Sequence, residues 1–243
     1  MKYFRIRRSL DEKAMGKIPQ IKEVIYPKVT DNPKFIGNID FAKIEFEPEI
    51  AKPILYPKAK QTDLIGDIGA ISFKLLISGK LKAIFEDYRK DATQFFQGGI
   101  FHNGIEYTDY WYLNMYAMND EFIDYTNSII NWEKKNDDYD ETYGTTPIEL
   151  KFSSFDEFNN EMEKARVNLE TFNVKKLILK DVKEDFFMLK NVEGGAGFFV
   201  SEKLKKEIED VGCTGIEFQP SELSYNEWLA PGGERERVYG KSW

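Results

Sequence analysis

Few residues in this sequence are able to perform acid–base, nucleophilic or metal chemistry. Its one histidine, His102, leaves no partner for a multi-histidine zinc site or an HExxH helix within the 243 residues. Its one cysteine, Cys213, follows the predicted end of a helix, where the helix dipole disfavours a thiolate. We interpret His102 as a loop residue beside Asn103 and Cys213 as a small buried side chain, and we predict no catalytic residue.

Two glycine-containing stretches lack the context that nucleotide binding needs. The glycines of segment 194–197 precede a predicted strand, whereas a dinucleotide-binding loop follows a strand and opens a helix. Segment 240–242 (GKS) ends like a phosphate-binding loop, but Arg235 stands where that loop has its first glycine. We therefore expect no cofactor.

Carboxylates are the only abundant groups with catalytic potential. Four of them cluster within five residues: Asp137, Asp138, Asp140 and Glu141. The cluster lacks the DxDxDG spacing of an EF-hand loop, and we predict no metal site there. Acid pairs that meet only in the folded chain are invisible in a sequence, so a carboxylate-based or metal-dependent hydrolase stays open as an alternative function.

Charge is unevenly distributed along the chain, whose net charge is −8. Residues 1–34 contain nine Lys or Arg against four Asp or Glu, whereas residues 117–163 contain thirteen acidic residues against three lysines. An acidic surface of this kind repels nucleic acid and anionic lipid and attracts a basic protein. The simpler interpretation is a solvated surface that keeps the protein in solution.

The cellular compartment of the protein is indicated by the targeting features that the sequence lacks. No run of about 18 apolar residues occurs that could span a membrane, and the N-terminal MKYFRIRRSL has no apolar signal region. A single cysteine forms no internal disulfide, which suits a reducing compartment. We expect a cytoplasmic protein with no membrane partner.

The clearest local structure is predicted for residues 194–220, which alternate strand, helix and strand. Ser201 stands at the helix N-cap and Gly212 at the C-terminal end, and residues 216–218 alternate as a half-buried strand. A similar pattern lies upstream at a constant offset, since Ser78 precedes Ser201 by 123 residues (201 − 78 = 123). The repetition suggests two related structural units.

Short strands are predicted around these units. Residues 2–8 and 41–46 alternate as half-exposed strands, and Asn103 with Gly104 suits a tight hairpin turn in an aromatic segment, 95–116. Three prolines indicate an irregular linker, in which a central strand is disfavoured: Pro48, Pro53 and Pro57. The segments 174–179, 186–189 and 198–200 are predicted to form an antiparallel meander, and 136–146 a polar loop.

The predicted fold is α+β, with mostly antiparallel short strands and a few amphipathic helices, because helices and strands do not alternate regularly. We expect a single domain over residues 1–243, divisible into an N-terminal lobe, 1–105, with the Pro-rich linker, and a C-terminal lobe, 106–243.

Three segments together resemble a bacterial immunity-protein family of polymorphic toxin systems, immunity family eleven. They are FFVSEKLKKEIEDVGCTGIEFQP (198–220), the Tyr-rich YTDYWYLNMYAMNDEFIDY (107–125) and the echo ISGKLKAIFEDY (77–88). The likeness covers roughly residues 77–220. The sequence departs from the family pattern at Gly79 and in its acidic loop, 136–141.

The resemblance implies a non-enzymatic protein that binds a cognate toxin and blocks it by occlusion, the toxin being a basic nuclease domain. On this interpretation the acidic surface attracts the toxin and aromatic side chains anchor it. The candidate partner-binding residues are Trp132, Asp137, Asp138, Tyr139, Asp140, Glu141 and Trp228. A second alternative is a non-enzymatic peptide- or sugar-binding module that uses the aromatic face of residues 107–116.

Overall fold

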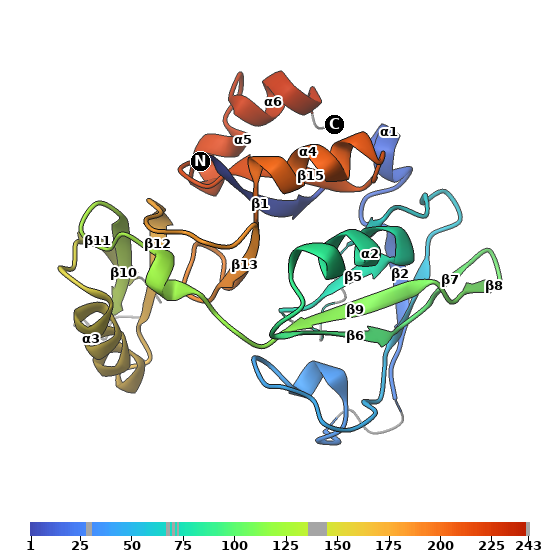
Figure 1. The fold of residues 1–243 in the computed structure, drawn as a ribbon, viewed down its shortest axis with the longest axis horizontal. Helices are drawn as coiled ribbons and strands as arrows, with labels where there is room; N and C mark the ends of the chain where they lie inside the picture. Colours follow the sequence, from blue (N-terminus) through green and yellow to red (C-terminus); the bar gives the residue numbers. More distant parts are fainter. Residues whose placement is uncertain (28–30, 67–68, 70, 72, 136–144, 242–243) are drawn as a thin grey trace.

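The computed structural model describes residues 1–27, 31–66, 69, 71, 73–135 and 145–241. The chain folds into several short, mostly antiparallel sheets with helices packed on them, an α+β arrangement as predicted (Figure 1). Two four-stranded sheets with one helix each share one apolar core. Two further sheets flank them, one on either side (Figure 1).

The first unit has the strand order β4-β5-β9-β6 and carries helix α2. Its bounds are β4 Leu64–Ile65, β5 Leu75–Ser78, α2 Gly79–Tyr88, β6 Thr93–Gln97 and β9 Tyr110–Met115. Helix α2 begins where predicted, because the Ser78 hydroxyl accepts the Leu81 N–H.

The second unit has the strand order β13-β14-β1-β15 and carries helix α4. Its bounds are β1 Tyr3–Arg8, β13 Phe186–Leu189, β14 Gly197–Ser201, α4 Glu202–Asp210 and β15 Ile216–Pro220. Ser201 caps α4 by accepting the Leu204 N–H, and Gly212 follows the helix with φ +73°, so both predicted helix boundaries are confirmed.

The two units share their hydrogen-bond register. Ser78 N–H donates to the Asp63 carbonyl at 2.8 Å, and Ser201 N–H donates to the Asp185 carbonyl at the same distance. The central strands also correspond, because Tyr112 pairs with Leu76 and Phe96, while Arg5 pairs with Phe199 and Gln219. The 123-residue offset in the sequence therefore marks two units of the same topology.

The two units take their central strands from different parts of the chain. In the first unit β9 follows β6, whereas in the second unit the central strand is β1, at the N-terminus. The first strand of the chain thus completes a sheet whose other strands lie near the C-terminus (Figure 1). The lobe boundary at residue 105 stays a prediction, and both of these sheets combine strands from the two sides of it.

A third sheet, β2-β3-β7-β8, lies beside the first unit. Its bounds are β2 Ile21–Ile25, β3 Lys52–Leu55, β7 Ile100–His102 and β8 Ile105–Tyr107; the short helices nearby are α1 Glu12–Met15 and the 3-10 turn Ile36–Asn38. The hairpin at Asn103 and Gly104 is confirmed, with φ of 52° and 78° at the two turn residues.

Two predictions about this region are wrong. Pro53 lies within β3, between β2 and β7, and is tolerated because β3 pairs with β7 only through Ile54 and Phe101. Residues 41–46 form no strand, although all are described. Their backbone is bound instead by a side chain, since the Gln94 amide both accepts the Ile44 N–H and donates to the Ile44 carbonyl.

The fourth sheet, with its helix, is called the insert because the chain forms it between the two units. Its bounds are β10 Ile129–Lys135, β11 Thr145–Leu150, α3 Phe155–Val167 and β12 Thr171–Lys176, preceded by the 3-10 turn Asp120–Phe122. Strand β12 pairs with β10, not with β13. The predicted three-stranded meander is therefore wrong in its first strand, while the β13–β14 pairing is confirmed.

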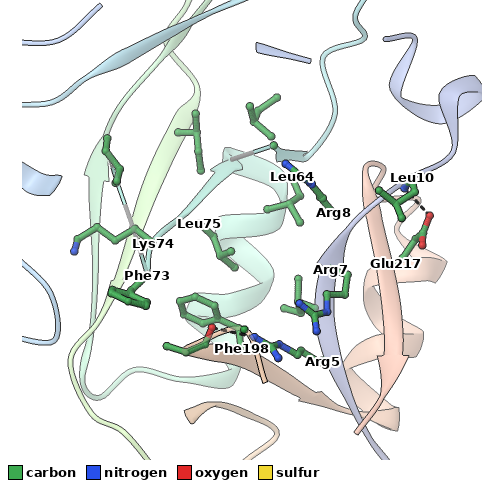
Figure 2. Close-up of a pocket in the computed structure, with 18 of the residues that line it drawn as sticks. Arg5, Arg7, Arg8, Leu10, Leu64, Phe73, Lys74, Leu75, Phe198 and Glu217 are labelled. Carbon is green, nitrogen blue, oxygen red and sulfur yellow. Dashed lines mark hydrogen bonds between the residues drawn. The ribbon is translucent and has the colours of Figure 1, made fainter. Parts of the chain in front are cut away.

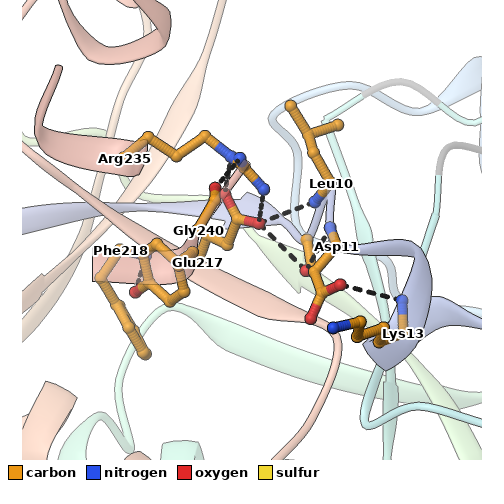
Figure 3. Close-up of polar contacts among 9 residues, drawn as sticks. Leu10, Asp11, Lys13, Glu217, Phe218, Arg235 and Gly240 are labelled. Atoms are coloured by element: carbon orange, nitrogen blue, oxygen red, sulfur yellow. Dashed lines mark hydrogen bonds and ion pairs between the residues drawn. The ribbon is translucent and has the colours of Figure 1, made fainter. Parts of the chain in front are cut away.

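The C-terminal segment is helical and partly buried. It forms α5 Tyr225–Leu229 and α6 Glu234–Tyr239. The half-buried strand predicted at 216–218 is wholly buried, with Glu217 only 1% exposed. Arg235 of α6 donates to both carboxylate oxygens of Glu217 at 2.7 Å, and the Leu10 N–H and Ser9 hydroxyl donate to the same carboxylate (Figure 3).

Replacing Arg235 with Ala should destabilise the protein strongly, because Glu217 would remain buried without its cation. Breaking a buried ion pair from one side costs about 3–5 kcal/mol, and urea unfolding followed by circular dichroism measures it. Arg237→Ala is the matched control: its ion pair with Glu234 is exposed, and we expect a change within about 1 kcal/mol. Equal losses in the two variants would contradict the proposed importance of the buried pair.

Asp63 links the two units. Its carboxylate accepts the Ser78 hydroxyl at 2.7 Å within the first unit and the Thr214 N–H at 2.7 Å from the second. Lys80 forms an ion pair with it at 3.1 Å. Burial raises the pKa of Asp63, but the hydrogen bonds from Ser78 and Thr214 and the charge of Lys80 outweigh burial and bring this pKa below its ordinary value.

Asp63 should therefore contribute to acid unfolding. Because its pKa is lower in the folded than in the unfolded chain, its contribution is complete above the ordinary value of 3.8 and is lost as the pH falls through the folded value. Asp63→Asn should be less stable at neutral pH and should lose less further stability on acidification. Asp185→Asn, at the equivalent position of the second unit, is the control, and urea unfolding at several pH values below about 5 compares them.

Candidate functional site

The insert carries Trp132, one of the two predicted partner-binding residues that the structure describes. Strand β10 is its central strand, with Trp132 opposite Ile148 of β11 and Phe172 of β12. The predicted contacts Asp137, Asp138, Tyr139, Asp140 and Glu141 lie outside the described residues. Their flanking residues Lys135 and Thr145 are register partners, so the acidic segment joins the insert at one end of the β10–β11 pair.

Trp132 is half-buried and held in place from two sides. Its ring stacks on Phe172, with centroids 5.4 Å apart and planes 18° from parallel. Its indole N–H donates to a Glu170 carboxylate oxygen at 3.0 Å. The ammonium of Lys134 lies 5.4 Å from the ring centroid. A ring fixed in this way loses little conformational entropy when a partner covers it.

Two apolar side chains that the sequence reasoning missed are exposed near Trp132. Val167 ends α3 with 83% of its surface exposed, and Leu169 follows with 79% exposed and a φ of 58°. The next residues, Glu170 and Thr171, contact or pair with β10 at Trp132 and Glu133. Nothing in the sequence marks these two residues as exposed; in the structure both follow Ala165, the last buried position of α3.

Trp228, the other predicted anchor, occupies a different environment. It is 1% exposed, lies in α5 and meets Tyr239 of α6 edge to face at 6.0 Å. Its ring therefore belongs to the packing of the C-terminal helices, and a partner has no access to it in this conformation. The large apolar ring of Trp228 contributes to the core rather than to an exposed surface.

Charged side chains of the insert are largely engaged with one another at its surface. Glu149 pairs with Lys175 at 2.8 Å, and Glu161 pairs with Lys164 in α3. Such exposed pairs contribute little to stability, and they stay available for exchange with a partner's charges.

The two residues considered for catalysis are His102 and Cys213, and each is at least partly buried in the fold. His102 is not a loop residue but ends β7, is 9% exposed, and lies with Nδ1 3.1 Å from the Gln61 amide. Cys213 is half-buried, and burial raises the pKa of its thiol to about 11, which keeps it protonated at neutral pH. Within the described ranges, no group of three or more His, Cys, Asp or Glu side chains could hold a metal ion.

Comparison with known proteins identifies the family. The model of the Immunity protein family (Imm11) matches residues 37–223, and the chain therefore belongs to this family. A search among curated proteins finds no match. The family resemblance of the sequence is thus confirmed, and it implies an immunity protein with a bacterial toxin as its partner and a non-enzymatic role. Among the described helices, none is long and apolar enough to cross a membrane.

The two predicted tryptophan anchors should differ in their effect on stability. Trp228→Ala removes a fully buried ring and should lower the free energy of unfolding by about 3–5 kcal/mol. Trp132→Ala removes a half-buried ring that stacks on one neighbour and should cost about 1–2 kcal/mol. Urea unfolding compares the variants, and a larger loss for Trp132→Ala would show that the insert depends on this ring for folding.

Proposed function

We propose that this protein neutralises its cognate toxin by occlusion, using the end of the insert where the acidic segment joins it. The observation that carries the proposal is the meeting of three features there: the held ring of Trp132, the exposed side chains of Val167 and Leu169, and the flanks of residues 136–144. Apolar anchors at the centre and charge around them are the usual composition of a tight protein interface.

The charge of the surface indicates the kind of toxin. Residues 129–163 of the insert lie within the most acidic part of the sequence, residues 117–163, which contains thirteen acidic residues against three lysines. Such a surface accelerates association with a basic protein and repels an acidic one. A nuclease domain has a basic active-site cleft because it binds phosphates, so covering that cleft would block the toxin's substrate. We propose this action in the cytoplasm, where a nuclease toxin meets its substrate.

The proposal is tested with the cognate toxin, by growth rescue on co-expression and by the dissociation constant of the purified pair. Leu169→Asp and Trp132→Ala should each weaken binding by at least about tenfold, because they remove central apolar contact. Ile105→Asp is the matched control: Ile105 is 57% exposed but lies on the β7–β8 hairpin, and its replacement should leave binding unchanged.

A second variant tests the acidic segment separately. Replacing Asp137, Asp138 and Asp140 with Asn and Glu141 with Gln should slow association at low salt and leave dissociation nearly unchanged. Failure of the wild-type protein to protect cells would overturn the immunity function. Protection with full binding by Leu169→Asp and Trp132→Ala would retain the function and overturn this surface.

A further inference from the structure

A cavity of about 510 Å³ lies between β1 of the second unit and strands β4 and β5 of the first (Figure 2). It opens where β14 separates from β1, because their pairing ends at Arg5 and Phe199. The first unit continues this pairing one step further, between Leu75 and Leu113. The cavity therefore results from a local difference between two otherwise similar sheets.

Arg7 presents its guanidinium to this cavity in a fixed orientation (Figure 2). Its Nε donates to the Gln219 side-chain oxygen at 2.7 Å, and its guanidinium carbon lies 4.9 Å from the centroid of the Tyr225 ring. Among the described residues, no hydrogen-bond or ion-pair partner is found for its two terminal nitrogens. A stacked, anchored guanidinium with both Nη groups available has the geometry for two parallel hydrogen bonds to an oxyanion.

Arg5 adds a second positive charge on the same wall. It is 7% exposed, although the sequence pattern predicted a half-exposed strand, and it donates to main-chain carbonyls of Glu193, Gly195 and Ala196. Burial and the charge of Arg7 lower the pKa of Arg5, and the charge of Glu193 opposes them, with the result that this pKa is about 9. An added anion would relieve the repulsion between the two cations.

The nearby carboxylates are committed to other partners. Glu193 accepts the Tyr225 N–H at 2.6 Å, and Glu217 forms the buried ion pair with Arg235. The fold itself does not require cations on this strand, because the equivalent positions of β9, which share the register of Arg5 and Arg7, are Tyr112 and Asn114. The two arginines thus stand where the sister unit has uncharged residues.

We propose that this cavity binds a small anionic molecule through a phosphate or carboxylate group, which Arg7 holds with its two terminal nitrogens. The cavity volume is in the range of small-molecule sites, and its apolar wall, including Leu64, Leu75 and Phe198, would cover the uncharged part of the ligand. The site is separate from the insert and independent of the toxin.

Thermal unfolding with simple oxyanions tests the proposal. Inorganic phosphate and succinate, each at about 10 mM and compared with chloride at equal ionic strength, represent the two chemistries. At least one should raise the Tm of the wild-type protein by about 3 °C or more, since a ligand that binds only the folded state stabilises it. A rise with phosphate alone or with succinate alone identifies the group. No rise with either overturns the proposal.

Substitutions of Arg7 test whether this residue is responsible for the rise in Tm. Arg7→Gln should abolish the rise in Tm, and Arg7→Lys should reduce it by more than half, because lysine keeps the charge but not the paired donors. Arg237→Gln, on the exposed side of α6, should keep the full rise. Near-ultraviolet circular dichroism verifies that each variant is folded. An unchanged rise in Arg7→Gln, or an equal loss in Arg237→Gln, would show non-specific ion binding.

Discussion

The contact between the helices of one unit and the sheet of the other is the interaction on which the structure depends. Phe85 of α2 stacks on Phe186 of β13 with ring centroids 4.1 Å apart, and Ile208 of α4 lies in the same core as Leu64 of β4. A four-stranded sheet with a single helix leaves apolar surface exposed, and each unit covers that surface on the other. The duplication is therefore also the source of the core.

This mutual packing explains why the N-terminal strand is needed. Strand β1 supplies Ile6 to the shared core on one face and carries Arg5 and Arg7 on the other. It pairs with β14 and β15, which are about 200 residues away in the sequence. Closing so large a loop costs entropy that only extensive burial repays, and Glu217 adds a direct anchor by binding Leu10 and Arg235 at once (Figure 3).

The sequence predicted the features that depend on local chemistry. The caps at Ser78 and Ser201, the turn at Asn103 and Gly104 and the offset between the units all follow from residue types at fixed spacing. The aligned segments around Ser78 and Ser201 also suggested the duplication, because a cap fixes the start of a helix to one residue.

Features that depend on distant partners were not predictable. Residues 41–46 alternate like a strand, but the Gln94 side chain binds their backbone, and no local pattern shows this. Trp228 had the size of an interface anchor, yet Tyr239 and the helix α6 cover it. Leu169 was overlooked because its left-handed backbone, with a φ of 58°, is rare for a residue other than glycine and is not indicated by the local sequence; its side chain is 79% exposed.

Surface substitutions in the insert are less constrained by the core between the two units than substitutions in the units themselves. The apolar cluster of the insert contains Phe152, Phe158 and Val174 together with Phe187 and Phe199 of the second unit, while the core between the two units is made of other residues. Substitutions at exposed positions at the end of α3 can therefore alter its surface without disturbing the mutual packing of the units. An immunity protein must follow changes in its toxin, and specificity changes when surface contacts change. Placing the proposed partner surface on exposed residues of the insert, such as Val167 and Leu169, permits such changes at small cost in stability, because substitutions of exposed residues usually change stability little.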